Sequence, residues 1–149
     1  MKVVVDTSVW ISGLLSPDSS AASVIRLLLE ERFILLYNNE CLLELREVCG
    51  RPKFVGLISP FQVKALIGLI ELKGVKVRLS RRVETTDPKD DYLLELALSG
   101  NADVLVTLDQ KDLLSVQQLE NTKILTTALF LRALGLSMPK NKLKKVRKA

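Results

Sequence analysis

Three consecutive valines near the start of the chain are followed at once by a carboxylate and two hydroxyls, in the order Val3-Val4-Val5-Asp6-Thr7-Ser8. An unbroken run of β-branched residues is typical of a strand that is buried on both faces, as in the middle of a parallel sheet. Open α/β folds hold their ligands outside the carboxyl ends of such strands. We therefore expect Asp6 at the ligand-binding edge of a central strand.

Short apolar segments alternate along the chain with segments of helical periodicity. Such alternation implies right-handed crossovers and a mainly parallel sheet with helices on both sides. We predict a three-layer α/β/α fold with a sheet of four or five strands over residues 1–137, followed by a basic tail over residues 138–149. After the first strand, the expected strands are 33–37, 75–79, 103–106 and 123–125, and the expected helices are 9–15, 21–31, 39–48, 60–73, 88–99, 109–114 and 127–134.

The residue types that are missing restrict the chemistry. No histidine occurs in the 149 residues, which excludes Ser-His and Cys-His nucleophilic triads and the common zinc sites. Cys41 and Cys49 lie too far apart along one expected helix to form a disulfide, so we interpret them as buried reduced thiols. Catalysis would therefore rest on carboxylates, hydroxyls, lysine or a hard metal ion.

The apolar segments and the charge balance bear on location and partners. No apolar segment approaches the roughly 20 residues of a membrane span, and the N-terminus has no signal-peptide pattern, so we expect a cytoplasmic protein with no membrane partner. The chain has 22 Lys and Arg against 17 Asp and Glu, a net charge of +5. This balance favours an anionic partner, although a modest basic excess also serves solubility.

Four carboxylates are expected at element ends that the sheet could bring together. Without a counterion they would repel one another, and their pKa values would rise. One or two Mg²⁺ or Mn²⁺ ions would resolve this conflict, since these hard cations favour oxygen ligands, and they could hold a phosphodiester and activate a water. The four residues are Asp6, Glu44, Asp91 and Asp109.

Each of these acids also has a purely structural explanation. Asp6 can cap the helix that follows it. Glu44 can belong to a solvated helix face with Glu40 and Glu47, at spacing i, i+4, i+7. The joint pattern of the four acids is stronger evidence than any one of them.

Two further groups of acids are ambiguous in the same way. We assign Asp87 to capping of the helix over 88–99, Asp90 to the rim of the site and Asp91 to the site itself. Asp109 with Asp112 is similar to a helix cap followed by a first-turn acid. Asp112 is a possible substitute or supplement for Asp109, which lies closer to the strand end.

The motifs around these acids resemble those of PIN-domain nucleases. Asp6-Thr7-Ser8 is similar to the opening motif of the family, and residues 40–48 with Arg51-Pro52-Lys53-Phe54 are similar to its second acidic motif. Residues 87–97 and 102–109 are similar to its third and fourth motifs. The resemblance runs from about residue 2 to 135 and is specific in combination. Two residues depart from the family pattern: Ser8 stands where Asn is common, and Leu108 replaces a small residue.

The resemblance implies roles for particular residues. Asp6, Glu44, Asp91 and Asp109 would be metal-binding catalytic acids, and Ser8 and Thr107 would be neighbouring hydroxyls that position water or a carboxylate. Family members are typically Mg²⁺- or Mn²⁺-dependent ribonucleases. Many small ones are VapC-like toxins that a cognate antitoxin protein neutralises.

Basic residues are the expected contacts to RNA. Aromatic content is only 5%, so we expect binding to depend on phosphate contacts more than on stacked bases. The candidates are Arg46, Arg51, Lys53, Lys89 and the C-terminal tail. For the tail, a solubilising or disordered extension is an equally good interpretation.

Other classes of protein remain open at this point. One is a catalytically silent PIN-like module that binds RNA or protein. A receiver-type phosphoryl-switch domain would need an Asp after a middle strand, and a haloacid-dehalogenase-type phosphatase would need an Asp at the position of Ser8. A homodimer through an apolar helix such as Leu66 to Leu72 is a further hypothesis.

Overall fold

The sheet places β1 (Lys2–Val5) at its centre, as the valine run predicts. The structure is a computed structural model that describes residues 1–83, 88–108 and 118–136, with the side chains of 88–90 and 118 outside that description. The strand order is β3-β2-β1-β4-β6-β5, and the pairs are parallel except for β5 with β6. The remaining strands are β2 (Ile34–Tyr37), β3 (Val75–Lys76), β4 (Val104–Val106), β5 (Gln118–Leu119) and β6 (Thr122–Leu125).

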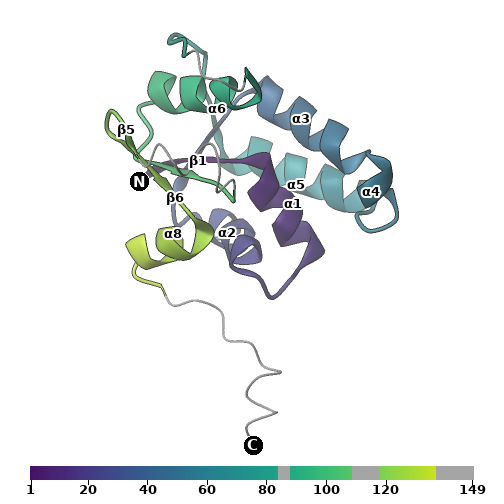
Figure 1. Ribbon diagram of the computed structural model, residues 1–149. Coiled ribbons are helices and arrows are strands. Elements are labelled where there is room, and N and C mark those ends of the chain that lie inside the picture. The colour runs from purple at the N-terminus through teal and green to yellow at the C-terminus, as the bar shows by residue number, and fades with distance from the viewer. Residues whose placement is uncertain (84–87, 109–117, 137–149) are drawn as a thin grey trace, which may run out of the picture.

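Helices cover both faces of this sheet, which confirms the three-layer α/β/α prediction (Figure 1). Val3 and Val5 pack into the core under α1, α2, α3, α5 and α8, whereas Val4 packs on the opposite face, against α6. This alternation is the two-residue period of a strand that is buried on both sides. The helices are α1 (Thr7–Leu15), α2 (Ser20–Leu29), α3 (Asn39–Cys49), α4 (Pro52–Val55), α5 (Pro60–Lys73), α6 (Pro88–Ser99) and α8 (Thr127–Ala133).

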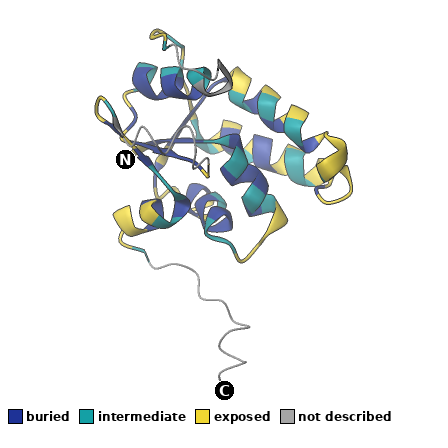
Figure 2. Ribbon diagram, in the orientation of Figure 1, coloured by how far each residue is buried: buried dark blue, intermediate teal, exposed yellow. Residues whose placement is uncertain are grey.

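Burial follows the same layers (Figure 2). The central strands and the inner faces of the helices are largely buried, and exposed residues gather on α4 and on the outer faces of the helices. Phe33 and Phe130 meet edge to face with ring centroids 5.4 Å apart, which fixes α8 against the strand layer. No helix in the described part of the chain is long and apolar enough to cross a membrane.

Local signals set most element ends. Ser59 and Gln62 form a reciprocal capping box at the start of α5. Gly74 follows α5, and a Cβ there would lie 2.6 Å from the carbonyl oxygen of Ile70 and 2.7 Å from the Tyr37 ring. Only glycine therefore lets β3 run so closely beside β2.

Several expected boundaries differ from the structure. The helix expected from residue 21 begins at Ser20, because Ser19 caps it: the Ser19 Oγ accepts a hydrogen bond from the Ala22 amide over 3.1 Å. The Ser20 hydroxyl lies 2.6 Å from that of Thr127. The strand expected over 75–79 has only two residues, at the exposed edge of the sheet. The short elements α4 and β5 were not predicted. The turn expected over 109–114 and the tail over 138–149 lie outside the described residues.

The two cysteines are free, as expected. Cys49 is buried and Cys41 is half-buried, on the same helix, α3. Burial raises the pKa of the Cys41 thiol to about 12. This thiol is therefore protonated at neutral pH and is a poor nucleophile.

Candidate active site

Asp6 lies between β1 and α1, at the carboxyl edge of the sheet. Its amide donates to the carbonyl of Val106 over 2.9 Å, which continues the pairing of β1 with β4. Its side chain makes no capping hydrogen bond to α1, so the capping explanation does not hold. Instead, the buried Thr107 hydroxyl donates to Asp6 Oδ2 over 2.7 Å. The carboxylate is thus held at the strand ends by the strand beside it.

Glu44 reaches the same region from α3. The Thr7 hydroxyl donates to Glu44 Oε2 over 2.7 Å, and the Tyr92 hydroxyl donates to the same oxygen. Glu44 is half-buried, whereas Glu40 and Glu47 on the same helix are exposed. Glu44 therefore does not belong to a solvated face with them.

The surroundings of Glu44 disfavour its charged form. Burial raises the pKa of its carboxyl, and the nearby Asp6 carboxylate raises it further, while the hydrogen bond from Thr7 acts in the opposite direction. A half-buried carboxyl whose pKa is raised by burial and by a neighbouring carboxylate is in the electrostatic setting that a bound cation would relieve.

A cleft of about 510 Å³ joins the two acids. Asp6, Thr7, Ser8 and Glu44 line it at the N-terminus of α1, and residues of α1, α3 and α4 line the remainder. The Leu108 amide donates to Ser8 Oγ over 3.4 Å, so Ser8 and Thr107 both lie beside Asp6. The cleft offers carboxylate and hydroxyl oxygens, the donors that Mg²⁺ and Mn²⁺ favour.

Of the other expected site acids, Asp91 is the one whose side chain the structure describes. Asp91 is half-buried in the first turn of α6, next to Tyr92, which contacts Glu44. Asp109 and Asp112 lie outside the described residues, as do the side chains of Asp90 and Lys89. Within the described part of the chain, no three acidic or thiol side chains are close enough to hold one ion together. The structure thus brings Asp6 and Glu44 together, and it does not join Asp91 to them in such a group.

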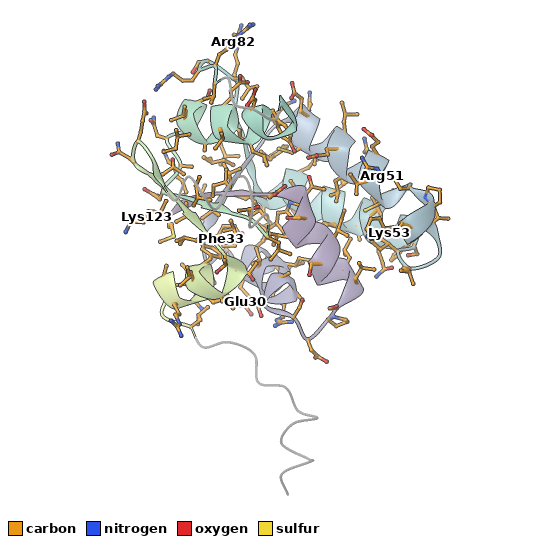
Figure 3. The ribbon with its side chains drawn as sticks, in the orientation of Figure 1. Glu30, Phe33, Arg51, Lys53, Arg82 and Lys123 are labelled. Carbon is orange, nitrogen blue, oxygen red and sulfur yellow. The ribbon has the colours of Figure 1, made fainter. Side chains whose placement is uncertain are left out.

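The candidate RNA-binding bases lie in different places. Lys53 lines the cleft with the acids, and its Nζ lies 5.4 Å from the centre of the Phe54 ring. Arg51 forms an exposed ion pair with Glu47, with N and O 3.6 Å apart. Arg46 lines a separate groove of about 620 Å³ between α3 and α5. Figure 3 shows Lys53 and Arg51 together near α4, far from Arg82 and Lys123.

Sequence reasoning missed Tyr92 as a partner of the site. A tyrosine one position after a candidate acid carries no signal of its own, because its hydroxyl meets Glu44 only through the packing of α6 beside α3. It also missed the helical face of Ser8, Ile11, Ser12 and Leu15, which lines the cleft. The spacing i, i+3, i+4, i+7 is a visible signal for that face.

Comparison with known families agrees with the fold. A sequence profile of the PIN domain matches residues 2–111, the larger part of the chain. The chain therefore belongs to the PIN-domain family. PIN domains are generally nucleases and typically use divalent metal ions. No curated protein matches the chain.

Proposed function

We propose that this PIN domain is a metal-dependent endoribonuclease that hydrolyses RNA phosphodiester bonds in the Asp6–Glu44 cleft. The observation that carries the proposal is the pairing of these carboxylates, each oriented by a hydroxyl donor, at the carboxyl ends of the central strands. Ligands of open α/β sheets bind at that edge. The net charge of the chain, +5 at pH 7, favours a polyanionic substrate.

The donor set fits a hard divalent cation. Asp6 and Glu44 would hold Mg²⁺ or Mn²⁺, and Asp91 and Asp109 join them by their place in the family's motifs. When bound, the ion supplies charge for a phosphate oxygen and a more acidic water. Asp6 also raises the pKa of Glu44, and this repulsion is what the cation would offset.

The chain's own residues have distinct tasks in this proposal. The Thr107 hydroxyl fixes one oxygen of Asp6, while Thr7 and Tyr92 both bind Oε2 of Glu44 and leave Oε1 to face a ligand. Lys53, which lines the same cleft, would bind a phosphate. Neither Thr7 nor Ser8 acts as a nucleophile, since the chain contains no histidine base.

The VapC-like toxin role is a finer part of the proposal. It rests on the resemblance of the motifs alone, and it requires an antitoxin partner that blocks the cleft. Expression of the chain should then arrest growth of the host cell, and Asp6→Asn should relieve the arrest. Growth that is unaffected by active enzyme would contradict the toxin role and leave the nuclease proposal intact.

A homodimer is proposed on the outer face of α5. Phe61 and Leu72 are 80% and 78% exposed. Gly68 lies between them, and a Cβ atom at that position would have no neighbouring atom within 4 Å. On one edge of this face, Lys64 precedes Glu71 by two helical turns. In an antiparallel pair of α5 helices, each Phe61 meets the other Leu72, and each Lys64 comes near the other Glu71. A second copy would therefore cover the two exposed apolar side chains and pair the two charges of this face.

The catalytically silent binding module is the alternative, and substrate cleavage separates the two. Mixed RNA and DNA substrates should be incubated with the intact chain in Mg²⁺, Mn²⁺ or chelator, alongside Asp91→Asn. We expect RNA cleavage that requires the ion and is slowed in the variant. Binding of RNA without cleavage in either metal would support the silent module instead.

A further inference from the structure

The cleft extends well beyond the two acids, along α1. Ser8, Ile11, Ser12 and Leu15 recur at i, i+3, i+4 and i+7, and Ser16 continues the row, so they line one face of the helix. From Ser8 to Ser16 this face is about 12 Å long by the rise of an α-helix. It is much longer than the binding of a metal ion alone requires.

The opposite side of the cleft comes from α3 and α4. Val48 lies one helical turn after Glu44, and Phe54 follows in α4, so an apolar surface begins directly beside the acids. Lys53 stands at the rim with its ammonium group near the Phe54 ring. The cleft therefore runs from carboxylates to an apolar slot with a cation at its edge.

Hydroxyl groups are interleaved with the apolar side chains of this slot. Ser12 and Ser16 both line it, and within the described residues neither hydroxyl has a hydrogen-bond partner. Apolar surfaces on two sides with a few free hydrogen-bonding groups suit a flat heteroaromatic ring. A volume of about 510 Å³ falls within the range of small-ligand sites.

We propose that this slot is a nucleobase subsite, which binds the base of the nucleotide next to the scissile phosphate. The base lies between Ile11 and Leu15 on one side and Val48 and Phe54 on the other. Ser12 and Ser16 meet its polar edge, and Lys53 binds a phosphate of the same strand. This inference rests on the proposed nuclease function, because that function places a phosphodiester at the acids.

A nucleotide explains the arrangement better than an apolar ligand does. Lys53 lines the same cleft as the two carboxylates, so an occupant of the whole cleft must suit both a cation site and an ammonium group. A nucleotide within an RNA strand has a phosphate on each side of its sugar, which suits both, and its aromatic base suits the apolar slot. Apolar residues of a partner protein would leave Lys53 and the two serine hydroxyls unsatisfied.

Abasic substrates test the subsite directly. An RNA oligonucleotide with a single cleavage position is compared with versions that carry an abasic ribonucleotide on either side of it. One of the two should lower kcat/KM by about 5- to 150-fold, the range expected for loss of one stacked base. In Phe54→Ala and in Leu15→Ala, the ratio of kcat/KM for intact RNA to kcat/KM for the abasic RNA, here called the abasic penalty, should fall towards one. Leu15 is 37% exposed, so its variant serves if Phe54→Ala does not fold.

The matched control is Leu29→Ala, which removes a 59% exposed leucine from α2, outside the cleft. It should leave the abasic penalty unchanged. Equal cleavage of abasic and intact RNA by wild type would overturn the subsite. So would an abasic penalty that is the same in wild type, Phe54→Ala and Leu15→Ala.

Ligand binding without turnover separates this inference from the nuclease proposal. Adenosine and uridine monophosphate are titrated into the metal-free protein, with ribose 5-phosphate as the probe that lacks a base. The nucleotides should shift the amide resonances of Ser12, Leu15 and Val48 more than ribose 5-phosphate does. Larger shifts from the nucleotides without any RNA cleavage would contradict the nuclease proposal and still support the base-binding subsite. Equal shifts from all three probes would overturn the subsite, whether or not RNA is cleaved.

Discussion

The Thr107 hydroxyl donates to Asp6 Oδ2 over 2.7 Å, between residues that are 101 positions apart in the chain. Parallel pairing of β1 with β4 brings them together, because both residues directly follow their strands. Thr107 is fully buried, so its hydroxyl has a fixed direction. The central acid is thus oriented by the strand that lies beside its own.

Thr107→Val should therefore impair catalysis more than folding. The substitution keeps the shape and removes the donor, so we expect about 10- to 100-fold lower activity, as for groups that orient metal ligands. Thr122→Val is the matched control, since it removes a buried hydroxyl that donates to the Ala102 carbonyl, away from the acids. It should lower thermal stability and keep activity. Equal activity loss in both variants would contradict the positioning role.

Tyr92→Phe should weaken the hold on Glu44. It removes one of two hydroxyls that bind the same carboxylate oxygen, so we expect a smaller loss of activity than Glu44→Gln gives. The apparent affinity for Mn²⁺ should also fall, by about 10-fold. Calorimetric titration of Mn²⁺ measures this, and unchanged affinity in Tyr92→Phe would argue against the contact.

Glu44 should make stability depend on pH in the absence of metal. A carboxyl whose pKa is raised by folding favours the folded state below its ordinary value of 4.5 and loses that contribution as pH rises through the raised pKa. The Glu44→Gln variant cannot ionise at this position, so its stability relative to wild type should increase from pH 4.5 upward. Denaturant unfolding with chelator measures this. Glu40→Gln, at an exposed position on the same helix, is the control. A stability difference between wild type and Glu44→Gln that stays constant with pH would contradict the account.

The α5 face should control the oligomeric state. Leu72→Glu places a charge opposite each Phe61 of the proposed antiparallel pair, so the variant should sediment as a monomer at micromolar concentration where wild type is a dimer. Leu129→Glu, at a 46% exposed position on α8, should leave the dimer intact. A wild-type chain that is monomeric under these conditions would contradict the proposed dimer through α5.

Much of the fold could be read from local patterns. The valine run predicted a doubly buried central strand, and the helix expected over 60–73 has the bounds of α5, because burial and capping leave short-range signals. The two-residue strands β3 and β5 gave no comparable signal, since their few residues are ordered by pairing with neighbours. Strand pairing over so short a length is a tertiary effect.

The site was predictable to a similar depth. Asp6 was predicted from its place after a buried strand, and Glu44 from the resemblance of its helix to a family motif; the structure places both in one cleft. The contacts of Tyr92 and the slot beside Phe54 depend on how α6 and α4 pack against α3, which no local spacing encodes. Low aromatic content led us to expect phosphate contacts more than stacked bases, and the proposed subsite adds one base contact beside Phe54.

Cleavage of a mixed-sequence RNA by wild type and Asp6→Asn tests the central claim most directly. The substitution keeps the size of the side chain and the Thr107 contact, and it removes the charge that would hold the ion. With saturating Mn²⁺ we expect wild type to cut the RNA, chelator to stop it, and Asp6→Asn to be slower by more than the roughly 100-fold typical of an outer-shell group. Equal cleavage by wild type, Asp6→Asn and chelator-treated enzyme would contradict the account.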